Sequence, residues 1–317
     1  MGTEKLITVV LPVFNRASIV VRTLDSIEAQ TSKDFKLVIV DNASTDNTFE
    51  VLTKWVNTHS DSSFQPTLLS ESTPGASAAR NCGLAAVETP YVMFFDSDDE
   101  MRFNHIERIA AHLRRFPNTD LLRWNVSTID DDGWLTTSDK HFHDEMQLHL
   151  MHSTLATLNY AVRTDICRDI GGWDQSISTF DDLELGVRLI ASGCKIQKLH
   201  GEPSVVIHHS NECISGNDYS SRANEISKAL DAIEDTLRNH NRTYDIRILN
   251  AKRVIVASHL KREKNIDSSK KFLTKALNSA IGKDRAALYA VYHTVRLFGK
   301  GGCFVALKLI GKKAEKH

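Results

Sequence analysis

The sequence predicts an α/β protein: a mixed, mostly parallel sheet with helices on both faces, followed by a C-terminal helical appendage. Two apolar runs, LITVVLPVF at 6–14 and the run that begins at Phe35, have no polar face, as expected for central strands covered on both sides. Helical patterns separate the strand candidates, which favours a parallel sheet. From Tyr219 onward only the helical period remains.

The first part of the chain alternates strands and helices in units of about 30 residues. Strands are expected at 6–14, 35–44, 67–71 and 91–95, and helices at 19–27, 49–56 and 76–86. In such sheets, ligands bind beyond the carboxyl ends of the strands. Asn15, Asp41 and Asp96 all follow strand candidates, so these polar side chains are expected at one edge.

The pattern is looser beyond Asp120. The expected elements are a hairpin turning at 131–133, a helix or lid at 141–156, a helix at 181–192, short strands at 195–199 and 204–208, and helices at 226–237, 244–260, 267–281 and 283–298. We expect one domain at 1–215 and a helical region at 216–317.

Composition excludes several classes of protein. Among 317 residues, Lys and Arg total 39 and Asp and Glu total 40, so the net charge of −1 offers no general field for nucleic acid. The five cysteines are scattered without a CxxC pair, which indicates a reducing cytosol and neither zinc nor a redox dithiol. No apolar run is long enough to span a bilayer. A chain in the cytoplasm, soluble or peripheral to the membrane, is expected.

An acidic cluster ends the strand candidate at 91–95. Two carboxylates about 4 Å apart repel each other by roughly 4 kcal/mol at an effective dielectric constant near 20. Asp96 and Asp98 would point to the same side of an extended chain, where both could face one cation. Oxygen ligands favour Mg²⁺ or Mn²⁺, completed by water and substrate phosphates. Alternatively, Asp99 and Glu100 begin the next helix.

The turn after the first strand, PVFNR, contains neither GxGxxG nor GxxxxGK[ST]. A dinucleotide fold or a phosphate-binding loop is therefore disfavoured. If phosphates bind, a cation has to neutralise them.

Six motifs in order carry a resemblance to a known family. They are PVFN at 12–15, VDNASTDNT at 40–48, GASAARNCGL at 75–84, FFDSDD at 94–99, GGWD at 171–174 and FDDLELGVRLIASG at 180–193. The chain resembles a family-2 glycosyltransferase of the GT-A fold, over nearly all of residues 6–210. The resemblance implies a nucleotide-sugar half at about 1–100 and an acceptor half at about 101–215.

The resemblance implies roles for the donor side. Asp41 would hydrogen-bond the base of a nucleotide, Arg80 would lie near the base or diphosphate, Asp96 near the ribose, and Asp98 would bind the metal in a DXD motif. The backbone of PVFN would pack along the nucleotide, which adds Pro12, Val13, Phe14 and Asn15 to the binding residues. Asn42 departs from the family pattern, in which a second Asp is frequent.

The resemblance also implies roles for the acceptor side. Asp182 matches the catalytic base, and Asp181, where Glu is usual, is a supporting neighbour; as an alternative, both are simply good N-terminal helix residues. Trp173 would stack on an acceptor sugar or pack in the core. His208 would approach the metal or diphosphate or be structural. Arg188 would support a loop or form a structural salt bridge.

The C-terminal end is basic where the whole chain is neutral. Seven basic residues between Arg285 and His317 face one acid, Glu315. The apolar residues between them are Phe298, Phe304, Val305, Leu307, Leu309 and Ile310. This pattern is typical of a segment that lies on anionic lipid, and equally of a basic end packed on the domain or used in a dimer.

Together these features predict an inverting glycosyltransferase that needs Mn²⁺ or Mg²⁺ and a nucleotide-diphosphate sugar, with UDP as the expected nucleotide. The acceptor would be a hydroxyl of a glycan or lipid-linked molecule in bacterial surface polysaccharide synthesis. The expected location is the cytoplasm, or the inner face of the cytoplasmic membrane, and a homo-oligomer is left open. The alternatives are a nucleotidyltransferase and a nucleotide-sugar or glycan binding module without catalysis.

Overall fold

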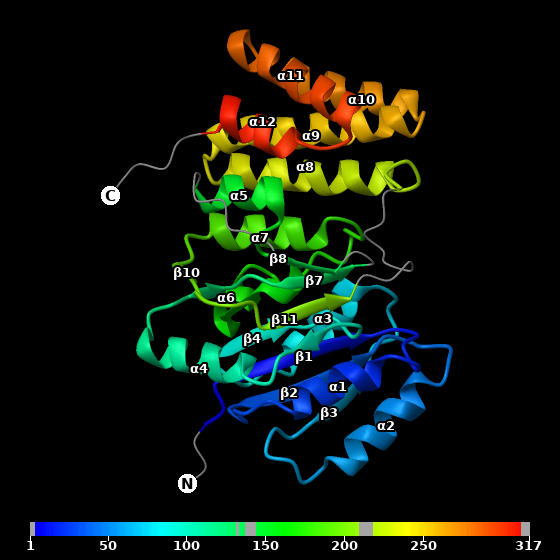
Figure 1. Cartoon of the computed structure of the whole chain (residues 1–317), viewed down its shortest axis with the longest axis vertical. Coiled ribbons are helices and arrows are strands. Elements are labelled where there is room, and N and C mark those ends of the chain that lie inside the picture. The colour runs from blue at the N-terminus through cyan, green and yellow to red at the C-terminus, as the bar shows by residue number, and fades with distance from the viewer. Residues whose placement is uncertain (1–3, 131–132, 137–143, 209–217, 312–317) are drawn as a thin grey trace. The chain divides into compact units, whose positions relative to one another are not determined.

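The computed structural model describes residues 4–130, 133–136, 144–208 and 218–311 (Figure 1). These residues form two compact units. The first, called the α/β unit, contains residues 4–130, 133–136, 155–178 and 194–208, and the second, called the helical unit, contains residues 144–154, 179–193 and 218–311. The sequence predicted two domains that are each one continuous range, 1–215 and 216–317. Each compact unit instead combines several separate ranges of the chain.

The α/β unit is built on a mixed sheet. Its described strands lie in the order β10-β6-β9-β4-β1-β2-β3. They are β1 (Ile7–Val13), β2 (Phe35–Asp41), β3 (Thr67–Ser70), β4 (Tyr91–Phe94), β6 (Leu121–Arg123), β9 (Tyr160–Arg163) and β10 (Ile196–Lys198). β9 runs antiparallel to both of its neighbours, and the other pairs are parallel. The mostly parallel sheet predicted from the sequence is confirmed.

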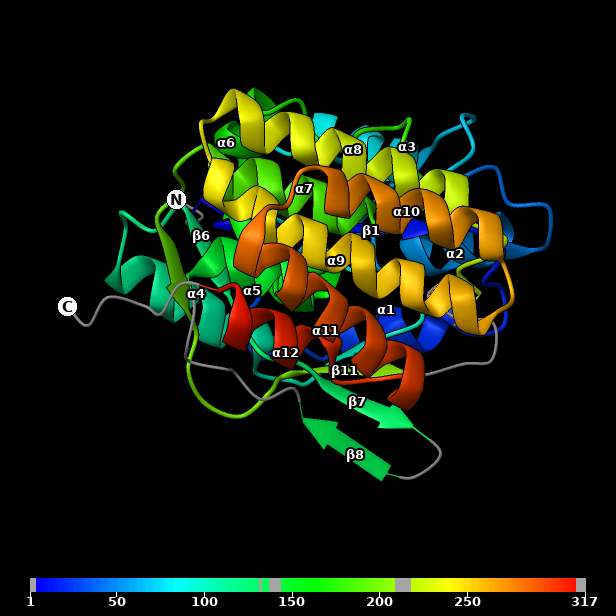
Figure 2. The ribbon, with the colours of Figure 1, turned by 90° about the horizontal axis from the view of Figure 1, so that it is seen from above.

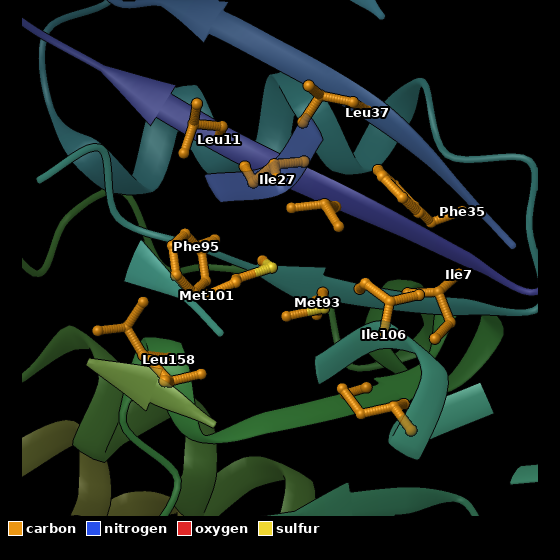
Figure 3. Close-up of a cluster of buried hydrophobic side chains, with 14 of the residues drawn as sticks. Ile7, Leu11, Ile27, Phe35, Leu37, Met93, Phe95, Met101, Ile106 and Leu158 are labelled. Carbon is orange, nitrogen blue, oxygen red and sulfur yellow. The ribbon is translucent and has the colours of Figure 1, made fainter. Parts of the chain in front are cut away.

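Helices lie on both faces of this sheet. The helical elements of the unit are α1 (Val20–Glu28), α2 (Thr48–Thr58), α3 (Ala76–Ala85), α4 (His105–Arg115), η1 (Thr157–Asn159) and α6 (Thr164–Asp169). Figure 3 shows the core on one face, where Ile7 and Leu11 of β1 pack with Ile27 of α1 and Ile106 of α4. Burying each such side chain stabilises the fold by about 1.5–3 kcal/mol.

The opposite face of the sheet is covered by α3. Gly83 lies so close to the strands that a Cβ there would overlap Cγ1 of Val10 and approach Cγ2 of Val40 to 3.3 Å. Only glycine lets α3 approach this closely. The close approach fixes α3, and with it Arg80, against the two central strands.

A second sheet follows the order β5-β11-β7-β8 among the described strands. These are β5 (Glu100–Met101), β7 (Ser127–Asp130), β8 (Gly133–Thr136) and β11 (Val205–His208). The predicted hairpin is present as the antiparallel pair β7 and β8, whose turning residues 131–132 lie outside the described part. The pairing of β5 with β11, which are a hundred residues apart in the chain, is not visible in sequence periodicity.

The helical unit consists of α5 (Glu145–His152), α7 (Asp181–Ala191), α8 (Ala223–Asn239), α9 (Thr243–Arg262), α10 (Ile266–Asn278), α11 (Gly282–Phe298) and α12 (Gly302–Leu309). α9 is its central helix and packs against α5, α8, α10, α11 and α12 (Figure 2). Among the described helices, none is long and apolar enough to cross a membrane. The sequence pattern did not predict α12, which begins where Gly299 and Gly301 end α11 in left-handed conformations.

Within the helical unit, α7 packs against α5 and α8. The ring of His149 lies over Gly186, and its Nε2 is 3.0 Å from the Leu183 carbonyl oxygen. Burial lowers the pKa of His149 to about 4, so this ring is neutral at pH 7 and donates to that carbonyl. α7, the helix that carries Asp182, therefore packs against a helix that precedes it in the sequence, α5, and against one that follows it, α8.

Candidate active site

Three neighbouring strands of the α/β unit end at one edge of the main sheet. β1 lies between β2 and β4, and Val13 is in register with Asp41 while Val10 is in register with Phe94. Asp41 is the last residue of β2, and Asn15 and Asp96 lie two residues beyond the ends of β1 and β4. The structure thus brings these polar residues to one edge, as their positions in the sequence predict.

The loop after β1 is tied to the loop after β2. Asn15 has a φ of 49°, a left-handed conformation that Asn tolerates better than most residues. Its backbone N–H donates to Ser44 Oγ (3.0 Å), and its Oδ1 accepts from the Thr45 N–H (2.8 Å). Asn15 therefore shapes this rim of the edge through contacts within the protein.

Asp41 lies below this rim. Its side chain is 4% exposed, and Oδ2 accepts from the Ser44 N–H (3.3 Å). Oδ1 is buried without a hydrogen-bond partner among the described residues. Leaving such an atom unpaired costs about 1–3 kcal/mol. A ligand N–H, such as that of a nucleotide base, would remove this cost.

The PVFN segment offers one ring to a ligand. Val13 is buried, Pro12 is half-buried, and Phe14 is 52% exposed. An exposed aromatic ring next to a buried carboxylate suits a planar ligand with polar edges.

The hydrogen bonds of Asn42 explain why this chain has Asn where a second Asp is frequent in the family. Its Nδ2 donates to the carbonyl oxygens of Glu71 (3.1 Å) and Thr73 (2.7 Å), and its Oδ1 accepts from the Gly75 N–H (2.8 Å). An Asp at this position has no hydrogens for the two carbonyls. Asn42 therefore holds the loop that leads into α3.

We expect Asn42→Asp to destabilise the protein, because a carboxylate would face two carbonyl oxygens and leave them unpaired, at a cost of about 1–3 kcal/mol. Urea unfolding of the variant and of wild type measures this loss. Asn57→Asp, on the exposed face of α2, is the matched control and should unfold like wild type. An Asn42→Asp protein as stable as wild type would contradict the assigned hydrogen bonds.

The acidic segment after β4 is a turn and not extended chain. The Asp99 N–H lies 3.5 Å from the Asp96 carbonyl oxygen, so the geometry assumed from the sequence for Asp96 and Asp98 was wrong. Both carboxylates are nevertheless half-buried while Ser97 between them is buried. Arg80 Nη2 lies 3.2 Å from Asp96 Oδ1, and Arg16 Nη2 lies 3.6 Å from Asp98 Oδ2.

Asp99 and Glu100 do not begin a helix, which corrects the alternative drawn from the sequence. Glu100 opens β5, because that strand pairs with β11. Asp99 Oδ1 accepts from the His208 N–H (2.8 Å), and His208 Nε2 lies 3.3 Å from Glu100 Oε1. Burial, and then the nearby Asp96 carboxylate, raise the pKa of Asp99 to about 8. At pH 7 Asp99 is therefore mostly protonated, and the turn carries less negative charge than its number of carboxyl groups suggests.

The residues of the acidic turn fit a divalent cation that takes only one or two of its ligands from the protein. Among the described residues, no group of three or more His, Cys, Asp and Glu side chains is arranged to hold a metal ion. Mg²⁺ sites on phosphate substrates need only one or two carboxylates, with water and phosphate oxygens as the remaining ligands. Asp98 is such a carboxylate. The donor set therefore suits a cation that arrives with a diphosphate.

Trp173 packs in the core and positions Arg80. The ring is 2% exposed, meets Phe94 edge to face with centroids 5.3 Å apart, and lies under the Arg80 guanidinium at 4.4 Å. Asn81 holds the Trp173 backbone through two hydrogen bonds of 2.8 Å. The Trp173 ring is covered by other side chains in this structure. Of the two alternatives drawn from the sequence, stacking on an acceptor sugar and packing in the core, the structure shows packing in the core.

Asp181, Asp182 and Arg188 belong to the helical unit. α7 begins at Asp181, which places both aspartates in its first turn, at the positive end of the helix dipole. Asp182 Oδ1 accepts from the Leu183 N–H (2.7 Å). Arg188 forms a bidentate ion pair with buried Glu184 (2.6 and 2.7 Å), which is the structural salt bridge considered from the sequence.

Lys252 of α9 was missed by the sequence reasoning. Its Nζ lies 5.4 Å from the centre of the Phe180 ring, just before α7. Burial lowers the pKa of Lys252, and the charges of Cys303 and Asp182 act in the opposite direction. A buried amine from the C-terminal helices therefore shares the electrostatic surroundings of Asp182.

Two arginines at the sheet edge were also missed. Arg16 pairs with Asp98, and Arg22 reaches the same turn from α1, with Nη2 2.5 Å from the Asp98 carbonyl oxygen and Nε 3.1 Å from Glu100 Oε1. Their signal in the sequence was a basic residue directly after the first strand and another on the following helix.

The ends of the central parallel strands thus bring a buried carboxylate, arginines and an acidic turn to one edge of the main sheet. The model of glycosyl transferase family 2 matches residues 8–168, and the chain belongs to this family. The resemblance seen in the sequence motifs is confirmed.

Relatives with assigned names cover part of the chain. It is 28% identical over 212 residues to the pre-mycofactocin glycosyltransferase of Mycobacterium tuberculosis, covering 64% of this chain and 42% of that protein. It is 34% identical over 114 residues to the teichoic acid poly(glycerol phosphate) polymerase of Staphylococcus epidermidis, covering 36% and 15%. The chain thus spans less than half the length of these two relatives.

Solved structures share the fold over most of the chain. The crystal structure of S. aureus TarS 1–349 in complex with UDP matches with a TM-score of 0.67 at 17% identity, covering 92% of this chain and 90% of that one. The mannosyltransferase PcManGT from Pyrobaculum calidifontis in complex with GDP-Man and Mn²⁺ matches with a TM-score of 0.56 at 17% identity, covering 97% and 87%. The GT-A fold class predicted from the sequence is confirmed.

Proposed function

We propose that this glycosyltransferase is metal-dependent and inverting, and moves a sugar from a nucleotide-diphosphate donor, a UDP sugar, to a hydroxyl of a glycan or lipid-linked acceptor in bacterial surface polysaccharide synthesis. The observation that carries the proposal is the buried, unpartnered Oδ1 of Asp41 at the edge that also holds the acidic turn. In a family-2 chain, this combination is suited to a base at one end of the edge and a diphosphate at the other.

Different residues of the α/β unit bind different parts of the donor. Asp41 accepts from the base, the backbone at 12–15 and the Phe14 ring lie along it, and Asp96 binds the ribose. Arg80, Arg16 and Arg22 add positive charge around the acidic turn, and their guanidinium groups match phosphate geometry.

Asp98 would hold Mn²⁺ or Mg²⁺, with His208 as a neighbouring ligand or support. The cation would supply Lewis-acid neutralisation of the charge that develops on the departing diphosphate. In support, the similar fold of PcManGT was solved with GDP-Man and Mn²⁺. Before the donor arrives, the chain's own Arg16 lies beside Asp98 and balances its charge.

Asp182 would accept the proton of the acceptor hydroxyl as its oxygen attacks the anomeric carbon. A single carboxylate that activates the incoming hydroxyl gives a product of inverted configuration, by the in-line logic of inverting glycosidases. This carboxylate lies in the first turn of α7, where the helix dipole is favourable for negative charge. Asp181 is a supporting neighbour, and the buried Lys252 amine lies in the same surroundings.

The surface-glycan context rests on one relative, which is named teichoic acid poly(glycerol phosphate) polymerase. A location in the cytoplasm or at the inner face of its membrane agrees with a cytosolic nucleotide-sugar supply. Membership in a glycosyltransferase family disfavours a nucleotidyltransferase. A binding module without catalysis remains the second candidate, against which the presence of both Asp98 and Asp182 counts.

The test uses the full chain with a panel of nucleotide sugars, in Mn²⁺ or in EDTA. A donor at 100 times its Kd should stabilise the fold by about 2.7 kcal/mol, seen as a rise in Tm, and only with metal present. Release of the nucleoside diphosphate measures turnover. Stabilisation by a donor without turnover on any acceptor glycan would favour the binding module, and equal stabilisation in EDTA would contradict metal dependence.

A further inference from the structure

α11 and α12 are the last helices of the helical unit, and each buries one face. α11 packs against α9 through Leu288, Val291 and Val295, and the Ser258 hydroxyl of α9 lies 3.1 Å from the Tyr292 carbonyl oxygen. α12 packs against α9 and α11 through Ala306 and Leu307. Figure 2 shows α11 and α12 side by side over α9. One face of each helix is therefore buried within the helical unit.

The remaining surface of α11, α12 and the residues beside them exposes large apolar side chains. Most of the exposed large hydrophobic residues in the described part of the chain fall within residues 281–309, namely Ile281, Tyr289, Leu297, Phe298, Phe304 and Leu309. Phe298 is 72% exposed, Leu297 69% and Phe304 59%. Of the apolar residues singled out in the sequence, Leu307 and Ile310 are buried, so they belong to the core. We call the six exposed residues the apolar set.

The exposed charged side chains of α11, α12 and the turn between them are all basic. The exposed basic residues are Lys283, Arg285, Arg296, Lys300 and Lys308. From Arg285 to Gly311 the sequence contains no Asp or Glu, and Asp284 forms an ion pair with Arg247 of α9. Lys308 Nζ lies 5.8 Å from the centre of the Phe304 ring. The whole chain has a net charge of −1, so this excess of basic residues is a local feature of the last two helices.

We propose that α11 and α12 dock on the surface of an anionic lipid bilayer. Aromatic and leucine side chains enter the boundary between head groups and acyl chains, while Lys and Arg bind the lipid phosphates and keep their charged ends in water. Each basic residue near an anionic surface strengthens binding about fivefold. Docking would hold the protein at the membrane where lipid-linked acceptors lie.

A second copy of this chain fits the surface poorly. A twofold interface pairs a patch with itself, so basic residues would meet basic residues with no acid between them. Anionic lipid supplies the missing negative charge without a specific shape. This comparison of charge selects the bilayer over self-association.

The experiment is co-sedimentation of the full chain with vesicles of phosphatidylcholine alone or with a quarter of phosphatidylglycerol. Phe298→Ser/Phe304→Ser tests the apolar set, and Lys300→Glu/Lys308→Glu tests the charge. Phe49→Ser/Phe103→Ser, which removes two exposed aromatic rings of the α/β unit, is the matched control. A chain ended at Gly311 separates the helices from the six residues that follow, which lie outside the described part.

We expect binding to the anionic vesicles only, at least tenfold weaker binding in each α11–α12 variant, and unchanged binding in the control and in the shortened chain. Unchanged Tm values show that the variants fold. Equal binding to neutral vesicles, unchanged binding by both variants, or loss of binding in the shortened chain would each overturn the proposal. So would a wild-type dimer, detected by light scattering without lipid, that the Phe variant makes monomeric. Vesicle binding needs neither donor nor metal, so the result is independent of the proposed function.

Discussion

Replacing Asp182 by Asn is expected to lower the rate of sugar transfer by about 10²- to 10⁴-fold, because the acceptor hydroxyl loses the group that takes its proton. The change is nearly isosteric, and the Asn side-chain oxygen still accepts from the Leu183 N–H, so α7 should remain folded. Donor binding, measured by the rise in Tm with nucleotide sugar and Mn²⁺, should stay at the wild-type level. The rate is measured with saturating donor and acceptor, so that kcat alone reports the loss.

The matched control is Asp181→Asn, one residue earlier in the same first turn. It removes the same charge from the same end of the helix and should reduce kcat far less. Equal losses in the two variants would mean that the helix terminus needs negative charge in general. A wild-type rate in Asp182→Asn would exclude Asp182 as the base and leave the family assignment intact.

Asp98→Asn should lower transfer by at least about 10²-fold, for a different reason. A metal ion contributes several kcal/mol of charge stabilisation at the departing diphosphate, and each 1.4 kcal/mol corresponds to a factor of ten in rate. The variant should bind Mn²⁺ weakly even with UDP present, which titration calorimetry measures. Its loss should therefore include donor affinity, unlike the loss in Asp182→Asn.

Glu100→Gln is the control for Asp98→Asn, because Glu100 carries the same charge in the neighbouring strand and pairs with Arg22. We expect this variant to bind Mn²⁺ and UDP nearly as wild type does. Full Mn²⁺ affinity in Asp98→Asn, or the same deficit in both variants, would contradict the role of Asp98 and indicate a general effect of charge around the turn.

The sequence predicted the donor side of the fold because its signals are local. Two-sided apolar runs identify β1 and β2, and the polar residues that follow them lie at one edge as a consequence of parallel pairing. The hairpin and the strand at 204–208 were predicted, but their assembly with β5 into a second sheet was not, because β5 has two residues and pairs with a strand about a hundred positions away. Such pairing leaves no periodicity to detect.

Side-chain partners were the least predictable part of the site. The acidic segment is a turn because Asp99 folds back toward Asp96 and is held by the His208 N–H from a distant strand. Asn42 was noted only as a departure from the family pattern, and the structure shows that its amide is a hydrogen-bond donor to two carbonyl oxygens. Both depend on contacts between segments that sequence spacing does not bring together.

The grouping of α7 with the C-terminal helices could not be read from the order of the chain. The sequence places 180–193 among the motifs of the resemblance, and the structure packs this segment with α5 and α8. Packing against buried His149 required Gly186, a residue whose small size has no meaning in the sequence alone.

The central claim is that Asp98 holds a divalent cation on a nucleotide diphosphate whose base is bound by Asp41. Crystals of the full chain grown with Mn²⁺ and UDP, measured at the manganese absorption edge, test it directly. The account predicts an anomalous peak about 2.1 Å from an Asp98 carboxylate oxygen, with the uracil N–H facing Oδ1 of Asp41. A manganese peak away from Asp98, or UDP bound with Oδ1 of Asp41 still unpaired, would contradict it.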